Sequence, residues 1–259
     1  MSDSLPLRLV LASASPARRK SLQAAGIEPD VLVSGVDESV VVTDRAEDLC
    51  LELARLKAQA VLTRLSPSTP PTSPSPGTDP GLSASPDPGL SAGPVTSTST
   101  STSTSTNQRT LVIGCDSVLA FDGEILGKPA DPADATRRWQ RMRGRSGVLH
   151  SGHCLIDMAA GRRAEAVAST TVHFADISDD EIAAYVASGE PLAVAGAFTI
   201  DGLGGPFVER IEGDPGTVVG LSMPLLRRLL AELGLQITDL WTKVAPGGQS
   251  VEPLGNVRS

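Results

Sequence analysis

The stretch LRLVLASASPARRK, residues 7–20, decides the fold of this chain. Its first half, up to Ser13, is an apolar run that predicts a strand, and its second half has the composition of a helix start. Ser15 suits the N-cap, Pro16 suits the first helical position, and Gly26 suits the residue just past the C-terminus. A strand that leads directly into a helix is typical of an α/β protein.

Strands and helices are predicted to alternate along the rest of the chain. A helix over 45–64 carries an Asp44–Glu47 capping-box spacing, and two further helices are expected over 178–189 and 224–233. A hairpin turn is expected at Asp122–Gly123. Strands are predicted over 111–121, 148–158, 166–174, 195–200 and 207–211. Together these elements predict one mixed sheet with helices packed on it.

A segment of low complexity interrupts this pattern over residues 65–106, where almost every residue is Ser, Thr, Pro or Gly. It cannot bury enough apolar surface to offset the entropy of ordering, so we expect a disordered insertion. A mucin-like glycosylated stalk is the alternative, but the chain shows no secretion signal. Residues 1–64 and 107–244 are therefore expected to form a single domain, followed by a loose tail over 245–259.

Charge and composition restrict the partners of the protein. The net charge is −8 and only 3% of the residues are aromatic. A surface for nucleic acid polymers needs many cations or aromatic stacking platforms, so neither duplex nor single-strand binding is expected. With so few aromatic residues, the core is expected to be aliphatic.

The cysteines and the hydropathy indicate a cytoplasmic protein. Cys50, Cys115 and Cys154 are odd in number and widely spaced, which favours neither a disulfide framework nor a structural zinc site. The N-terminal apolar run is short, is interrupted by Arg8 and lacks a basic leader. No segment reaches the roughly twenty apolar residues of a membrane span, so no membrane partner is expected.

Two arginines lie at the wrong end of the first predicted helix. A helix N-terminus carries partial positive charge and unpaired N–H groups, so Arg18 and Arg19 are unfavourable there unless an anion binds. A phosphate group would interact with all of these donors together. The alternative is that both arginines are solvated surface charges.

A carboxylate interrupts the buried strand predicted over 111–121. A lone ionised Asp116 would be costly there, so it needs a partner: a divalent cation, a basic residue or a catalytic water. Lys128 is a candidate neighbour across the hairpin, and backbone N–H groups are the structural alternative. Lys57 lies at the edge of the apolar stripe of its helix, where it either points into a cleft or extends into solvent.

These residue types are the components of metal-assisted triphosphate hydrolysis. Asp37 and Glu38 place carboxylates at another strand end, and Mg²⁺ typically binds through one or two carboxylates plus substrate phosphates. No GxxxxGK[ST] sequence is present, which excludes a P-loop enzyme. His150 and His153 form no metal motif and are expected to be structural.

Eight motifs in this order resemble the Maf family of nucleoside triphosphate pyrophosphatases, especially its actinobacterial members, over about residues 9–235 apart from the insertion. They are LASASPARR (11–19), VDE (36–38), LARLKA (53–58), GCDS (114–117), GKP (127–129), YVASGEP (185–191), AGAF (195–198) and VVGL (218–221).

The resemblance implies an α/β fold similar to that of inosine triphosphatases, with two lobes around a mixed twisted sheet and a central substrate cleft. It implies cleavage between the α- and β-phosphates with Mg²⁺ or Mn²⁺. Asp116 would accept the proton of the attacking water, and Glu38 would help Asp116 to hold the metal. The triphosphate would be bound by Ser13, Arg18, Arg19, Lys57 and Lys128. Homodimers are common in the family, but the sequence does not decide the oligomeric state.

Departures from the family pattern concern the choice of base. Ser117 replaces the Thr of pyrimidine-selective relatives, and Asp201 replaces their Gln. A carboxylate only accepts hydrogen bonds, which suits the N–H edge of guanine, whereas Gln both donates and accepts. The extra Ala17 is similar to the 7-methylguanosine-triphosphate branch, although the Trp of that branch is absent. We expect a guanine-like or mixed preference; the alternative is that Asp201 is a surface acid without a role in base choice.

Two other functions compete with this prediction. One is a nucleotide-responsive regulatory protein acting on cell division or septum formation, as the family's filamentation history suggests. A pure binder needs the cations but not a buried acid beside them, so Asp116 favours an enzyme. The other is a phosphatase, which would release orthophosphate instead of pyrophosphate.

Overall fold

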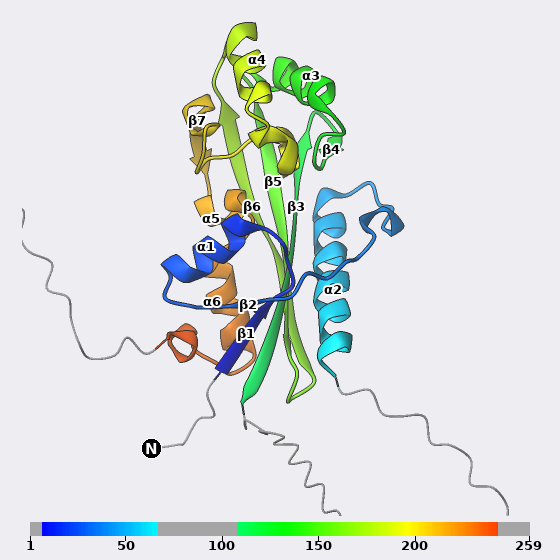
Figure 1. Cartoon of the computed structure of the whole chain (residues 1–259), viewed down its shortest axis with the longest axis vertical. Coiled ribbons are helices and arrows are strands. Elements are labelled where there is room, and N and C mark those ends of the chain that lie inside the picture. Colours follow the sequence, from blue (N-terminus) through cyan, green and yellow to red (C-terminus); the bar gives the residue numbers. More distant parts are fainter. Residues whose placement is uncertain (1–6, 67–107, 243–259) are drawn as a thin grey trace, which may run out of the picture.

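A computed structural model describes residues 7–66 and 108–242 of the chain (Figure 1). Its sheet has seven strands in the order β2-β1-β3-β5-β6-β7, and β4 pairs with β3. β1 is parallel to β2 and β3, and the other pairs are antiparallel. The strands are β1 (Leu7–Leu11), β2 (Asp30–Val31), β3 (Arg109–Phe121), β4 (Glu124–Leu126), β5 (Ser146–Asp157), β6 (Arg162–Phe174) and β7 (Val208–Glu212). The predicted mixed α/β fold is confirmed.

Helices cover both faces of this sheet. The α-helices are α1 (Pro16–Ala24), α2 (Ala46–Leu65), α3 (Pro132–Met142), α4 (Asp179–Ala187), α5 (Pro215–Val219) and α6 (Met223–Glu232). Short 3₁₀ turns are η1 (Glu38–Val40), η2 (Glu190–Ala193), η3 (Ala195–Ala197), η4 (Gly205–Phe207) and η5 (Ile237–Leu240). None of these described helices combines the length and apolar character that crossing a membrane requires.

The parts of the chain on either side of residues 67–107 belong to the same sheet. β1 pairs in parallel with the start of β3, with Leu9 opposite Leu111 and Leu11 opposite Ile113. Leu65, which we assigned to the insertion, is the last residue of α2. The rest of the predicted insertion, beyond Ser66, and the predicted tail over 245–259 lie outside the described residues.

The molecule has two lobes joined by the long strands β3, β5 and β6 (Figure 1). In the lobe that contains β1 and β2, the alternation of side chains along β1 divides the core between two faces. Leu9 and Leu11 pack with residues of α1 and α6, whereas Val10 and Ala12 pack with residues of α2. In the second lobe, α3 and α4 cover the other end of the same strands.

The expectation of a wholly aliphatic core is wrong for the second lobe. All four Phe and the single Tyr belong to the core of this lobe, together with Trp139, which is one of the two Trp and is fully buried. Phe174, Tyr185 and Phe207 each meet its ring edge-to-face, with centroids 5.6–5.9 Å apart. Composition gave the number of aromatic residues, but the fold gathers them in one place.

Most predicted helix ends are confirmed. The Ser15 side chain caps α1 at the Arg18 N–H, and Gly26 follows the helix with φ +78°. The Ser178–Glu181 capping box opens α4. The predicted hairpin at Asp122–Gly123 is also present, and both residues have positive φ.

Two local predictions are wrong, and two helices were not predicted. The N-cap of α2 is Arg45, without a side-chain cap, so Asp44 and Glu47 form no capping box. The strand predicted over 195–200 is interrupted because Gly196 and Ala197 adopt positive φ and form η3. The helices α3 and α5 were not predicted, although Asp131 and Pro132 give α3 a capped start.

Helix α2 lies unusually close to the sheet. A Cβ on Gly114 would lie 2.2 Å from the Ala54 carbonyl oxygen, and a Cβ on Gly152 would lie 2.3 Å from the Cys50 carbonyl oxygen. The helix backbone therefore rests directly on β3 and β5. Because Lys57 lies one turn after Ala54, this contact determines where the Lys57 side chain begins.

We expect Gly114→Ala and Gly152→Ala each to destabilise the protein by about 3 kcal/mol or more, because a rigid helix backbone must move. Gly127→Ala is the control, since its Cβ would meet nothing within 4 Å and its φ is not positive. The measurement is the free energy of unfolding in urea. Losses below about 1 kcal/mol at both tight glycines would show that α2 is free to shift.

Candidate active site

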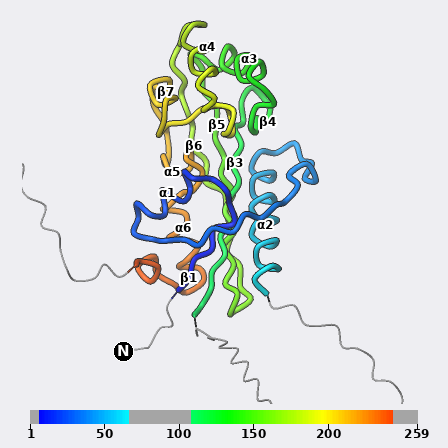
Figure 2. Tube along the Cα trace, in the orientation of Figure 1, coloured from blue at the N-terminus to red at the C-terminus, as the bar shows by residue number. Residues whose placement is uncertain are grey.

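A cleft of about 740 Å³ lies between the two lobes. The turn between β1 and α1, the segment over 33–43 and the inner face of α2 line one side, and residues 193–201 line the other. Figure 2 shows the segment between β2 and α2 crossing in front of the long strands. Eight of the nine predicted site residues line this cleft: Ser13, Arg18, Glu38, Lys57, Asp116, Ser117, Lys128 and Asp201.

Lys57 connects the two predicted metal-binding carboxylates. Its ammonium Nζ lies 2.5 Å from Oδ1 of Asp116 and 2.6 Å from Oε1 of Glu38. Asp116 is on β3, Lys57 is on α2 and Glu38 opens η1, so three separate elements meet here. The Lys57 side chain points into the cleft, and Asp116 has Lys57 as its ion-pair partner instead of the expected Lys128.

The environment of Asp116 raises the proton affinity of its carboxylate. Asp116 is only 7% exposed, and burial raises the pKa of its carboxyl group above the usual range, with Glu38 adding to the rise. Lys57 and Arg18 act in the opposite direction but do not cancel the effect of burial. A carboxylate with raised proton affinity beside a cation is characteristic of catalytic sites.

Arg18 is buried beneath the cleft and is held mainly by the protein. Its Nε donates to the Gly220 carbonyl at 2.9 Å, and its Nη1 donates to the Cys115 carbonyl at 2.9 Å and to Ser13 Oγ at 3.0 Å. Its Nη2 donates to Ser117 Oγ at 3.1 Å. Four of the five N–H donors of a guanidinium are thus engaged, which leaves one for a ligand.

Arg19 is the predicted site residue that the structure places elsewhere. Its half-exposed side chain forms an ion pair with Glu28 at 3.1 Å and does not line the cleft. A cation at a helix N-terminus is electrostatically unfavourable, and Arg18 and Arg19 offset this unfavourable energy with different partners. Arg18 turns inward to protein oxygens, and Arg19 turns outward to a carboxylate.

Hydrogen bonds fix the direction of the Ser117 hydroxyl. Ser151 donates its only hydroxyl proton to the Thr217 carbonyl at 2.8 Å, so the 2.7 Å contact between the two serines must be donated by Ser117. Ser117 also accepts from Arg18, so it presents only an acceptor to the cleft. Ser151 was not predicted, although a polar residue in a buried strand was the signal that could have identified it.

The surroundings of His153 and of the three cysteines are consistent with structural roles. His153 is fully buried and accepts from the Ser222 N–H at 2.9 Å, and burial lowers its pKa to about 4. Cys50, Cys115 and Cys154 are buried free thiols. Within residues 7–66 and 108–242, His, Cys, Asp and Glu nowhere form a group of three that could hold a metal unaided.

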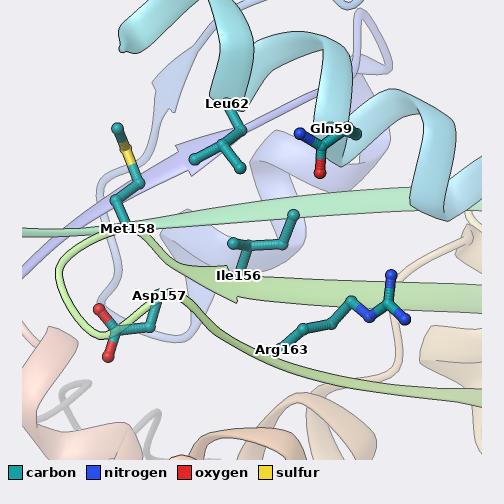
Figure 3. Close-up of a pocket in the computed structure, with 7 residues that line it drawn as sticks. Gln59, Leu62, Ile156, Asp157, Met158 and Arg163 are labelled. Atoms are coloured by element: carbon teal, nitrogen blue, oxygen red, sulfur yellow. The ribbon is translucent and has the colours of Figure 1, made fainter.

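A second, smaller hollow of about 240 Å³ lies at the far end of β5 and β6, where Gln59 and Leu62 of α2 face Ile156 and Met158 (Figure 3). The buried Asp157 beside it already accepts hydrogen bonds from Arg109. The charged groups that could perform chemistry together lie in the large cleft.

Arg18 and Arg19 form a matched pair for mutation. We expect Arg18→Gln to lower the free energy of unfolding by about 2–4 kcal/mol, because it leaves buried carbonyls without donors. Arg19→Gln should change it by less than about 0.5–1 kcal/mol, because the lost ion pair is exposed. Urea denaturation of both variants tests this difference, and equal effects would contradict the assignment of Arg18 to the interior.

Comparison with known proteins identifies the family of this chain. The family model described as Maf-like protein matches residues 8–233. A protein from Salinispora tropica named nucleoside triphosphate pyrophosphatase is 70% identical over 98% of this chain and 94% of its own length.

Two further proteins have the same name. The one from Streptomyces coelicolor is 50% identical, and the match covers 90% of this chain and 94% of its own length. The one from Thermosynechococcus vestitus is 46% identical, and the match covers 90% of this chain and 98% of its own length. The matched region contains every residue of the cleft. This chain is a member of the Maf family.

Proposed function

We propose that this protein hydrolyses nucleoside triphosphates to nucleoside monophosphates and pyrophosphate, cleaving between the α- and β-phosphates. The observation that carries the proposal is the Lys57 ammonium between the carboxylates of Asp116 and Glu38, inside a cleft large enough for a nucleotide. The name shared by the similar proteins supports the same reaction.

Asp116 is the proposed general base. Its buried position raises its pKa, so it binds a proton more readily than an exposed carboxylate would. In the ionised form it accepts a proton from the water that attacks the α-phosphorus, and the pyrophosphate group leaves. Lys57 keeps the ionised form accessible by neutralising its charge.

Glu38 and Asp116 fit a divalent cation such as Mg²⁺ or Mn²⁺. Both carboxylates approach the same Lys57 nitrogen, so they converge on one point, and carboxylate oxygens are the ligands that these cations prefer. Two protein ligands suffice where substrate phosphates complete the coordination. The cation would neutralise phosphate charge during cleavage.

The phosphates would interact with cationic and hydroxyl groups from several elements. Lys57 and the exposed Lys128 line the cleft, and Arg18 retains one free donor. Ser13 Oγ already accepts from Arg18 and from the Ser15 N–H, so its own proton is available to a phosphate oxygen. Because Arg19 lies outside the cleft lining, its expected role as a phosphate ligand has no geometric support.

The proposed base preference is for guanine-like or mixed substrates. Ser117 and Asp201 both line the cleft, and both offer only acceptors to a ligand. Guanine presents adjacent N–H donors, whereas uracil and thymine alternate donor and acceptor.

A regulatory protein that binds nucleotides without hydrolysis is less consistent with the site. Such a protein gains nothing from a carboxylate buried at 7% exposure next to the phosphate-binding cations. We place the enzyme in the cytoplasm, in agreement with its three buried free thiols.

Asp116→Asn should reduce pyrophosphate release by about 10³-fold or more, because the amide cannot accept the proton. The assay measures pyrophosphate and orthophosphate separately with Mg²⁺ or Mn²⁺, and EDTA should abolish the wild-type activity. Glu165→Gln, in a half-buried ion pair with Arg55 outside the cleft lining, is the control. Orthophosphate as the first product would instead indicate a phosphatase.

Asp201→Asn should weaken selection among bases, because the amide adds a donor that a uracil carbonyl can accept. We expect kcat/KM for GTP to fall by about tenfold and that for UTP to rise or stay constant. A panel of canonical and 7-methylated nucleoside triphosphates measures this ratio. Equal wild-type rates on GTP and UTP would contradict a guanine preference.

A further inference from the structure

Glu190 is a half-buried carboxylate that accepts four hydrogen bonds. Its Oε1 accepts from Thr199 Oγ1 at 2.6 Å, from Gly204 N–H at 3.0 Å and from the Tyr185 hydroxyl at 3.1 Å. Its Oε2 accepts from Leu203 N–H at 3.0 Å. All four donors belong to the second lobe, and three of them lie within the loop over 199–204.

This loop is built around the carboxylate with no spare space. A Cβ on Gly202 would lie 2.5 Å from Oε2 of Glu190, and a Cβ on Gly204 would lie 2.4 Å from the Tyr185 hydroxyl oxygen. The backbone N–H groups of Leu203 and Gly204 point inward to Glu190. Asp201, between these contacts, is exposed and lines the cleft.

The two lobes contribute different charged groups to the cleft. The first lobe contributes Arg18, Lys57, Asp116 and Glu38, and the described part of the second lobe contributes Lys128, just after β4, and Asp201 as its one carboxylate. A polyphosphate that interacts with Lys57 and Arg18, and with a cation held by Asp116 and Glu38, lies toward the first lobe, and Asp201 would repel it. The uncharged part of a nucleotide, with its N–H groups, suits the Asp201 end.

We propose that Glu190 is the positioning residue for base selection: it holds the loop over 199–204 so that the Asp201 carboxylate meets donor groups of the bound nucleobase. This inference rests on the proposed function. Glu190 is not among the residues that line the cleft, so it would not contact a substrate bound there. It acts through the loop, as a fixed, acceptor-only anchor on the short turn that follows α4.

The anchor requires the ionised form of Glu190. Burial opposes ionisation, but the hydrogen bonds from Thr199, Leu203 and Gly204 outweigh it, so the pKa of Glu190 is lowered. An amide at this position would direct its own NH₂ group toward the backbone N–H donors of the loop, which need an acceptor. Glu190→Gln keeps the size of the side chain, and it removes the acceptor capacity that orders the loop.

The test compares Glu190→Gln, Asp201→Ala and the double variant. For Glu190→Gln we expect KM for the preferred triphosphate to rise about tenfold while kcat changes by less than about threefold. The preference among bases should fall to that of Asp201→Ala, and the double variant should be no worse than Asp201→Ala, because both changes remove one interaction.

Glu181→Gln is the matched control. The Glu181 carboxylate also accepts a backbone N–H, from Ser178 at 2.7 Å, and it lies on α4 in the same lobe, away from the cleft lining. If Glu190 only stabilises this lobe, both variants should lose stability and neither should alter base preference. Unfolding curves recorded beside the kinetics distinguish stability from positioning.

A binding experiment separates this inference from the proposed reaction. Calorimetry with non-hydrolysable α,β-methylene analogues of GTP and UTP measures base discrimination without turnover. If the wild type releases no pyrophosphate but still binds one analogue more tightly than the other, the proposed reaction is rejected. The positioning role is then kept if Glu190→Gln abolishes this difference in affinity. Unchanged discrimination in Glu190→Gln, or none in the wild type, would overturn the role of Glu190.

Discussion

The contact between α2 and the strands β3 and β5 is the constraint on which the site depends. Gly114 and Gly152 allow the helix backbone to rest on the sheet, with no room for even one Cβ between them. Gly114 and Asp116 point to the same face of β3, two residues apart, and Ala54 and Lys57 lie one turn apart on α2. The close approach at the glycines therefore brings the Lys57 ammonium to 2.5 Å from the Asp116 carboxylate. A side chain at either glycine would separate the groups of the proposed catalytic centre.

The two lobes then have different tasks. The first lobe, with an aliphatic core around β1, supplies Arg18, Lys57, Glu38 and Asp116 and so concentrates charge at one end of the cleft. The second lobe has an aromatic core around Trp139, and it carries the loop that presents Asp201. The indole N–H of Trp139 donates to the Ala197 carbonyl at 2.7 Å, directly before this loop. Packing and hydrogen bonds thus hold the substrate-facing loop from both the Trp139 and the Glu190 sides.

Much of the fold followed from local patterns. The β1–α1 turn, the Ser178 capping box and the Asp122–Gly123 hairpin are encoded by neighbouring residues, and each was predicted where the structure has it. The strand expected over 195–200 failed because Gly196 and Ala197 adopt positive φ, which an apolar sequence does not reveal. The capping box at Asp44 failed because the helix began one residue later, at a position that local spacing does not fix.

The sequence by itself determined the α/β class, the family resemblance and the need of a buried Asp116 for a partner, because strand and helix periodicity and the cost of burying a charge are local properties. Only the tertiary structure decided that the partner is Lys57, that Arg18 turns inward while Arg19 turns to Glu28, and that Glu190 anchors the Asp201 loop. These pairings join residues on different elements, up to 202 positions apart for Arg18 and Gly220. Their choice depends on how helices and strands pack, and no short window of sequence contains that information.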